Sequence, residues 1–348
     1  MIKRILTSFL LISILSCNAQ NTALNTEFVL PGVIPEASGM VVLQNHFWII
    51  NDSGNAPKLY KMDFSGGLVD SIYIKEGNVD WEDLTIDPNG NIYIGDFGNN
   101  TNDRKDLVIY KVLYTDLTKD TISPQEIHFN YGNQTSFPPQ ANQMNFDCEA
   151  FIWYADHLLL FTKNRSESNQ TKIYRISDVP GNYTTYPLDS IPTNGWITSA
   201  SLSFNKMHLM LLSEDSLFVV NNFSDQNFQG TSVDTITFDK SQKEAIYMDG
   251  NGKVFISEEA ENGGSNYMFS LNLAQVLKTY IPQNTSITIA RKTDYIELKN
   301  STKEAITIQV FAYDGKLIDT IILRDQYQYK IKNSNPLIFR SEKFAVLK

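Results

Sequence analysis

The chain has few of the residues that build disulfide frameworks or nitrogen- and sulfur-ligated metal centres. It holds only two cysteines, Cys17 and Cys148. Its four histidines stand far apart, at His46, His128, His157 and His208. That spacing excludes a zinc site of the usual kind, and no intramolecular disulfide can form if Cys17 is lipidated or removed. Stability must therefore come from a packed core or from an ion held by oxygen ligands.

Positive charge is also scarce. The chain has 29 basic and 39 acidic residues, a formal net charge of −10. Removal of a leader containing Lys3 and Arg4 takes this to −12, by subtracting two positive charges. A chain this acidic is not expected to bind nucleic acid or an anionic membrane surface.

After the leader, no apolar run is long enough to span a bilayer. The leader itself has two basic residues followed by an apolar stretch from Ile5 to Leu15, typical of a signal peptide over residues 1–20. Cys17 follows Ile14-Leu15-Ser16, which resembles the lipobox of bacterial lipoproteins. We therefore expect an exported protein, anchored to the outer membrane by lipid at Cys17 or, if cleaved near Ala19, secreted or held at the cell surface.

One short phrase recurs along the rest of the chain: a glutamate, then a small or acidic residue, opening a strand-like run. The copies are Glu36-Ala37-Ser38-Gly39, Glu82-Asp83-Leu84, Glu149-Ala150-Phe151 and Glu244-Ala245-Ile246, with Ser199-Ala200-Ser201-Leu202 as a fifth copy carrying serine. The intervals are 46, 67, 50 and 45 residues, by subtraction of these positions. Repeats of this length built from strand signals predict a β-propeller over residues 21–283, with five blades, or six if one repeat has lost its phrase.

Blade five lacks an evident outer strand. The segment from Thr26 to Leu30, ahead of the first repeat, could supply that strand and close the ring. Closure would remove an exposed sheet edge.

The chain changes character near Pro282. Residues 284–348 contain several short strand-like runs, which predict a small C-terminal β-sandwich. The phrase Phe311-Ala312-Tyr313-Asp314-Gly315-Lys316-Leu317 and the ending Phe344-Ala345-Val346-Leu347-Lys348 resemble the C-terminal sorting domain of the type IX secretion system of Bacteroidetes. An ordinary accessory sandwich is the alternative.

The repeated glutamates predict a metal site. In a propeller the first strand of each blade lines the central channel, so Glu36, Glu82, Glu149 and Glu244 should converge there. Several carboxylates cannot all stay ionised at close range without a cation. Oxygen ligands without histidine or cysteine suit calcium. The alternative is a set of structural carboxylates satisfied by backbone N–H groups.

A second ring follows the next strand of each repeat. Its members are predicted to be Asp52, Asp96, Lys163, Glu214 and Glu258. Either these residues line the mouth of the channel, or they are solvated turn residues.

Five phrases of the chain form a further pattern: Glu36-Ala37-Ser38-Gly39, Asn51-Asp52-Ser53-Gly54, Asp80-Trp81-Glu82-Asp83, Asp96-Phe97-Gly98-Asn99-Asn100 with Arg104, and Asp147-Cys148-Glu149-Ala150. These phrases resemble those of SdiA-regulated and phytase-like propellers and, more distantly, those of the gluconolactonase and paraoxonase group. In the lactonases a channel calcium polarises the substrate carbonyl. Carried over by position, the four glutamates would hold that ion, although the lactonases mix asparagine with carboxylate ligands.

Two functions are compatible with these features. The first is an exported calcium-binding propeller that binds a small molecule or glycan in the cell envelope without catalysis. The second is a calcium-dependent hydrolase of a lactone, ester or phosphoester. In the hydrolase, Asp52 or Asp96 would act as base and Lys163 or Arg104 would stabilise the oxyanion. The sequence does not choose an oligomeric state.

Overall fold

The computed structural model describes residues 20–166, 169–203, 206–250, 252–260, 264, 266–276, 287–291, 295–300, 305–312, 317–324, 326–330, 337–341 and 344–347. Residues 1–19 of the predicted signal peptide, which include Cys17, and the predicted boundary near residue 283 lie outside these residues. Within the described part of the chain, no helix is long and apolar enough to cross a membrane.

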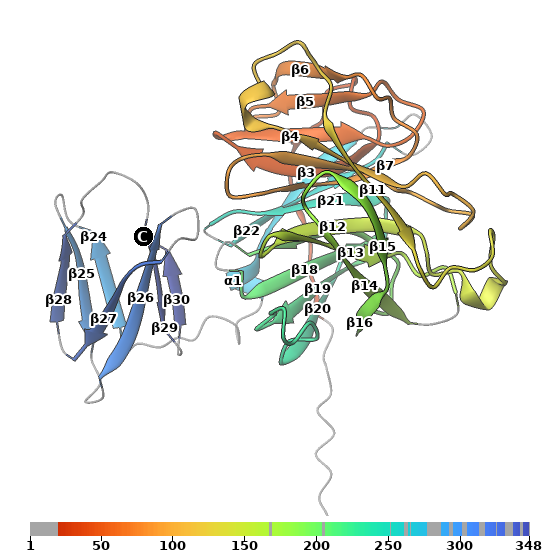
Figure 1. Cartoon of the computed structure of the whole chain (residues 1–348). Helices are drawn as coiled ribbons and strands as arrows, with labels where there is room; N and C mark the ends of the chain where they lie inside the picture. Colours follow the sequence, from red (N-terminus) through yellow and green to blue (C-terminus); the bar gives the residue numbers. More distant parts are fainter. Residues whose placement is uncertain are drawn as a thin grey trace, which may run out of the picture.

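Five four-stranded antiparallel units form the blades of a propeller (Figure 1). Blade one is β3 (Ala37–Leu43), β4 (His46–Asn51), β5 (Lys58–Met62) and β6 (Leu68–Ile74). Blade two is β7 (Trp81–Ile86), β8 (Ile92–Asp96), β9 (Val108–Val112) and β11 (Gln125–Tyr131). Blade three is β12 (Cys148–Tyr154), β13 (His157–Thr162), β14 (Gln170–Ser177) and β16 (Pro187–Pro192). Blade four is β17 (Ile197–Leu202), β18 (His208–Ser213), β19 (Ser216–Asn221) and β20 (Ser232–Thr237).

Blade five confirms the predicted closure of the ring. It consists of β21 (Lys243–Met248), β22 (Lys253–Glu258) and β23 (Tyr267–Asn272), and its outer strand is β2 (Asn25–Val29). Strand β2 runs antiparallel to β23, with Val29 opposite Tyr267. The N-terminal segment therefore completes the last blade, as the lack of an outer strand in that repeat predicted.

The innermost strands pack against one another in a closed cycle. Strand β3 contacts β7, β7 contacts β12, β12 contacts β17, β17 contacts β21, and β21 returns to β3. This cycle confirms five blades rather than six. Because every blade enters the ring by its first strand, all five inner strands begin at one end of the propeller and finish at the other.

Three short strands extend blades across their edges. Strand β10 (Thr121–Ile122) lies parallel to β6, β15 (Gly181–Thr185) lies parallel to β11, and β1 (Gln20–Asn21) lies parallel to β20. Strands β10 and β15 each come from the following blade in sequence, so they link neighbouring blades and cover sheet edges. The remaining short elements are η1 (Tyr114–Asp116), η2 (Ala141–Gln143) and α1 (Leu273–Val276).

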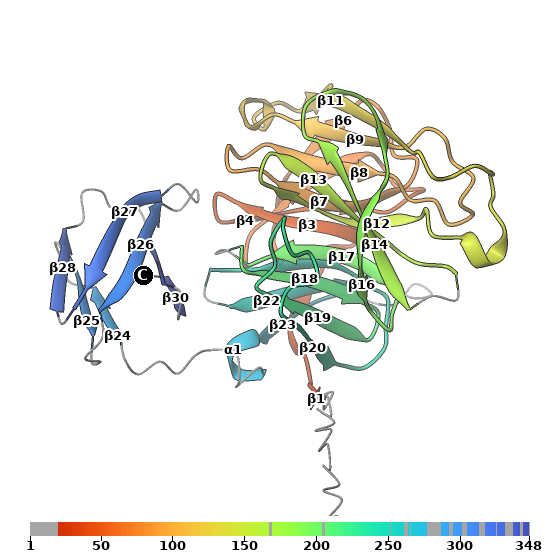
Figure 2. The ribbon, with the colours of Figure 1, turned by 60° about the horizontal axis from the view of Figure 1, so that its bottom comes forward.

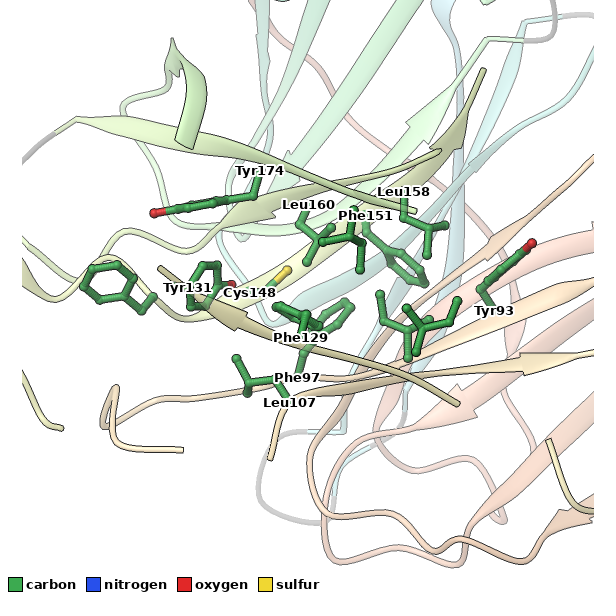
Figure 3. Packing of buried hydrophobic residues seen from close by; sticks show 14 of the residues in the cluster. Tyr93, Phe97, Leu107, Phe129, Tyr131, Cys148, Phe151, Leu158, Leu160 and Tyr174 are labelled. Atoms are coloured by element: carbon green, nitrogen blue, oxygen red, sulfur yellow. The ribbon is translucent and has the colours of Figure 1, made fainter. Parts of the chain in front are cut away.

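Apolar side chains fill the spaces between blades. Between blades two and three, Phe97 packs edge-on against Phe151 at 5.1 Å, and Tyr131 packs against Tyr174 at 4.6 Å (Figure 3). Cys148 lies in the same cluster and is fully buried. The alternating strand pattern produces this arrangement, because each blade turns one apolar face toward each neighbour.

The C-terminal part forms two small antiparallel sheets beside the propeller (Figure 2). One contains β24 (Ile287–Arg291), β25 (Tyr295–Asn300) and β28 (Gln326–Lys330). The other contains β26 (Ile306–Ala312), β27 (Leu317–Leu323), β29 (Leu337–Ser341) and β30 (Phe344–Leu347). Residues 313–316 of the sorting-domain phrase lie outside the described residues. Its role in secretion stays a prediction.

Candidate metal centre and ligand site at the channel mouth

Each inner strand carries a β-bulge near its start. The register of the first strand on the second skips one residue in every blade: Ser38, Glu82, Glu149, Thr198 and Glu244. A bulge leaves one residue out of the ladder and re-aims its side chain. Five equivalent bulges therefore direct five side chains toward the same end of the propeller, which we call the mouth.

The bulges correct the alignment of two repeats. In blade one the residue equivalent to Glu82 is Ser38, not Glu36, and in blade four it is Thr198, not Ser199. Both hydroxyls bridge to the next blade: Ser38 Oγ donates to the carbonyl of Trp81 at 3.0 Å, and Thr198 Oγ1 donates to that of Lys243 at 2.7 Å. The repeated glutamate phrase gave the wrong alignment for blade one, because its glutamate, Glu36, stands two residues before the bulge residue Ser38.

The second ring also shifts. Asp96 and Glu258 are the Cα partners of Trp81 and Lys243, whereas Asp52 and Lys163 stand one residue beyond the corresponding partners Asn51 and Thr162. The equivalent positions are therefore Asp52, Phe97, Lys163, Glu214 and Glu259. Two residues before the bulges stand Glu36, Asp80, Asp147, Trp196 and Gln242. These three sets of positions supply most of the charged side chains at the mouth, whereas Phe97 packs between blades two and three.

Three carboxylates come together there. Asp52, Asp80 and Glu82 place one oxygen each within 4.8 Å of one another. Burial is the main cause that raises the pKa of all three groups, and repulsion by neighbouring carboxylates adds to it: Glu36 acts on Asp52, Asp52 on Asp80, and Glu149 on Glu82. The pKa of Asp80 reaches about 6. A cation among these oxygens would relieve both effects.

Glu82 has no direct partner in the described part of the chain, although the charges of Lys163 and Arg165 act on it from a distance. Its side chain is only 6 % exposed, and no hydrogen bond or ion pair reaches its carboxylate from the described residues. Gly98 keeps the space around it open, since a Cβ there would lie 2.1 Å from Glu82 Oε1 and 2.4 Å from Asp80 Oδ2. A buried charge without partners is costly. The surroundings of Glu82 therefore fit an oxygen-coordinated cation such as calcium.

The other half of the mouth contains its own cations. Lys163 Nζ lies 2.9 Å from Glu149 Oε2, and Arg165 Nη2 lies 3.2 Å from Glu149 Oε1. Arg165 Nε also pairs with the buried carboxylate of Asp147. Burial lowers the pKa of Lys163, but the carboxylates of Glu149 and Glu244 outweigh it and raise the pKa above its usual value. Lys163 therefore stays charged and neutralises part of the glutamate ring.

The four predicted metal ligands thus have different surroundings. Glu82 lies in the carboxylate cluster, and Glu149 is paired with Lys163 and Arg165. Glu36 Oε2 accepts a hydrogen bond from Asn55 Nδ2. Glu244 is half-buried, and burial raises its pKa to about 8 in spite of the charge on Lys163. These four groups share the mouth, while among the described residues only Glu82 has two further carboxylate oxygens at ligand distance.

Of the predicted catalytic residues, Asp52 and Lys163 lie at the mouth, whereas Asp96 and Arg104 form a pair behind it. Arg104 Nη2 contacts Asp96 Oδ1 at 2.9 Å, and Arg104 Nη1 donates to the carbonyl of Gly98 at 2.8 Å. Asp96 is fully buried and accepts hydrogen bonds from the backbone N–H groups of Val79 and Asp80. The observed contacts of this pair hold in place the two loops that carry Asp80 and Gly98.

Beneath the mouth, one carboxylate ties three inner strands together. Asp83 Oδ2 accepts from the backbone N–H of Phe151 on β12 at 3.1 Å and from that of Ala200 on β17 at 3.3 Å. The Ser199 hydroxyl donates to Asp83 Oδ1 at 3.0 Å, and the N–H of Ile246 on β21 donates to the Ser199 hydroxyl at 3.3 Å. Asp83 and Ser199 therefore close the axis between the mouth and the far end.

Sequence reasoning missed several residues of the mouth. Asp80 and Asp147 stand two residues before the bulge glutamates, and Glu259 belongs to the ring that contains Asp52 and Lys163. Arg165 and Trp196 were missed as well: Arg165 stacks on the half-exposed Trp196, 5.2 Å from the ring centre. A signal existed for the acids, because Asp80-Trp81-Glu82 and Asp147-Cys148-Glu149 share the spacing Asp-x-Glu.

Comparisons with known proteins show no family for this chain. No protein-family model matches the sequence, and no curated protein matches it either. Among solved structures, a glucose dehydrogenase covers 72 % of this chain and 99 % of its own, at 8 % identity and a TM-score of 0.43. A gluconolactonase from Xanthomonas campestris covers 66 % of this chain and 69 % of its own, at 12 % identity and 0.38. The WD40 domain of Toxoplasma gondii coronin covers 93 % and 83 %, at 11 % identity and 0.37.

These similarities assign no activity and no ligand to the chain. The strand pairing and the closed cycle of inner strands define it as a five-bladed β-propeller followed by small C-terminal sheets.

Proposed function

We propose that this protein is a calcium-binding β-propeller of the cell envelope that holds the ion through Asp52, Asp80 and Glu82 and binds a small polar molecule or a glycan at the mouth. The observation that carries the proposal is the buried Glu82 carboxylate, which has no partner among the described residues and faces two more carboxylates in a space that Gly98 keeps open. Calcium accepts six to eight oxygen ligands. Three side chains leave coordination positions for water or for ligand hydroxyls and carboxylates.

Besides the ion, the side chains of Lys163, Arg165 and Trp196 would contact a ligand at the mouth. Lys163 donates one hydrogen bond to Glu149 among the described contacts, so its ammonium group retains donors for an incoming oxygen. Arg165 is held in place by ion pairs with Asp147 and Glu149. It lies over the ring of Trp196, which is 48 % exposed and therefore accessible to a ligand. Export and lipidation at Cys17 belong to the same proposal, since they rest on the leader alone.

Calorimetric titration of the chelator-treated protein with calcium, magnesium and zinc tests the proposal. We expect one calcium ion to bind, magnesium to bind more weakly and zinc not to bind at this site. Glu82→Gln should weaken calcium binding by at least ~10-fold, because it removes a charged ligand. Gly98→Ala should weaken it as well, because the new methyl group would enter the space of both carboxylates.

Gly32→Ala is the matched control, since a Cβ at Gly32 would meet nothing within 4 Å. Calcium binding by Glu82→Gln that equals that of the wild type, or no binding by the wild type, would contradict the proposal.

A calcium-dependent hydrolase is the second candidate, and the charged Lys163 at the mouth favours it. A bound calcium would supply Lewis acidity. Lys163 would orient the ligand oxygen and stabilise negative charge that develops on it. Hydrolysis of chromogenic esters and lactones that requires calcium, and that is lost in Lys163→Met protein that still binds calcium, would support catalysis. Calcium binding without any turnover would leave the binding role.

A further inference from the structure

The far end of the channel, opposite the mouth, contains a separate cavity of about 450 Å³. The five inner strands end here, roughly 13 Å from the bulges at 3.3 Å per residue. Its wall includes half-buried apolar side chains from several blades: Val42, Leu43, Ile86, Leu202, Tyr247 and Met248. Asp83 and Ser199 separate this cavity from the mouth. The size lies within the range of small-molecule sites.

Two charged residues line this cavity, Asp87 and Lys206, and they differ in how many partners they already have. Asp87 is buried and already used: Oδ1 accepts from the N–H groups of Asn89 at 2.8 Å and Asn91 at 3.0 Å, and Oδ2 accepts from Asn91 Nδ2 at 2.7 Å. Tyr93 also donates to Asp87 Oδ2, at 3.2 Å. This carboxylate therefore has no need of a ligand cation.

Lys206 is the opposite case. Its Nζ lies 4.9 Å from the ring centre of Trp153, and both residues line the cavity. Within the described residues, its ammonium group has no carboxylate within ion-pair distance. The side chain is half-buried, and burial lowers its pKa. A partly desolvated ammonium beside an apolar wall is complementary to a ligand with an apolar body and one negative charge.

We propose that this cavity binds a small amphipathic anion, with the apolar body against the ends of the inner strands and a carboxylate on Lys206. Such a site is independent of calcium, because the cavity contains none of the carboxylates of the mouth. One propeller would then carry two sites, a polar one at the mouth and an apolar anion site at the far end.

Calorimetric titration with decanoate, with decanol as the uncharged probe, tests the proposal, both below their aggregation concentrations and with chelator present. We expect decanoate to bind the wild type and decanol to bind at least ~10-fold more weakly. Lys206→Met should reduce decanoate binding to the level of decanol without changing decanol binding. Quenching of tryptophan fluorescence through Trp153 is an independent readout.

Lys61→Met is the matched control, since Lys61 also lies over a tryptophan, 5.5 Å from the ring centre of Trp48, but does not line the cavity. It should bind decanoate like the wild type. The proposal is overturned if wild-type protein binds no decanoate, or if Lys206→Met binds it as well as the wild type does.

Discussion

The hydroxyl of Ser199 donates a hydrogen bond to the carboxylate of Asp83 across the propeller axis, joining residues 116 positions apart at 3.0 Å. Position 83 immediately follows a bulge on β7, and position 199 immediately follows a bulge on β17. On β3 the equivalent residue is Gly39, where a Cβ would lie 2.6 Å from the backbone N of Leu84. The axis is therefore closed by small or hydrogen-bonded residues directly beneath the mouth.

This closure predicts a large effect for Asp83→Ala. The substitution leaves the N–H groups of Phe151 and Ala200 buried without an acceptor. At about 1–3 kcal/mol for each of the two unsatisfied groups, we expect a loss of roughly 2–6 kcal/mol in the free energy of unfolding, measured with urea. Asp70→Ala is the control, because Asp70 is exposed and the one hydrogen bond to its carboxylate within the described part of the chain comes from the adjacent Ser71 N–H. Equal stabilities for the two variants would rule out the role assigned to Asp83.

Lys163→Met should destabilise the protein at pH 8. The substitution leaves the nearly buried carboxylate of Glu149 with Arg165 alone. Breaking a buried pair costs about 3–5 kcal/mol when the remaining charge has no partner, so with Arg165 in place we expect a loss of up to about 3 kcal/mol. At pH 5 the loss should be smaller, because the pKa of Glu149 is raised, chiefly by burial, and the carboxyl can protonate.

Lys240→Met provides the comparison for Lys163→Met. Lys240 pairs with Glu214 at 2.8 Å, but its side chain is 72 % exposed. Exposed pairs contribute about 0–1 kcal/mol. A pH-independent loss in Lys163→Met, or one no larger than in Lys240→Met, would speak against a neutralising role for Lys163.

The raised carboxylate pKa values predict how stability depends on pH. Burial raises the pKa of Asp80 from 3.8 to about 6, and that of Glu244 and Glu259 from 4.5 to about 8. Between the unfolded and folded values, the folded protein binds more protons than the unfolded chain. Stability of the calcium-free protein should therefore fall as pH rises from about 4 to about 8.

Calcium should oppose this fall, since it binds the ionised carboxylates, and its stabilising effect should grow as pH rises through about 6. Thermal melts at pH 5, 6, 7 and 8, with chelator and with calcium, measure both trends. Stability of the chelated protein that rises over this interval would contradict the raised pKa values.

The fold could be predicted largely from the sequence. Strand alternation and turn residues recur at a blade-sized interval, and the missing outer strand of blade five pointed to the segment from Thr26 to Leu30, close to the observed strand β2. These features are local or periodic, so they can be recognised in the sequence without knowledge of tertiary contacts. The edge strands β10 and β15 could not be predicted, because each pairs with the preceding blade and not with its own.

The site could be predicted only in outline. The repeated glutamates located the mouth, but the phrase alone could not reveal that a bulge sets which residue points there. The sequence pattern therefore aligned Glu36 and Ser199 with the bulge glutamates, whereas the bulge residues of their blades are Ser38 and Thr198. The pairing of Lys163 with Glu149, and the space left by Gly98 beside Glu82, depend on contacts between loops of different strands. No spacing rule encodes such contacts.

An anomalous-difference map from crystals grown with calcium would locate the ion directly. We predict one strong peak at the mouth, about 2.3–2.6 Å from carboxylate oxygens of Asp52, Asp80 and Glu82. Crystals of Glu82→Gln should lack this peak. A wild-type map with no peak at the mouth, or with the peak between Glu149 and Glu244 instead, would contradict the assignment of the ion to these three carboxylates.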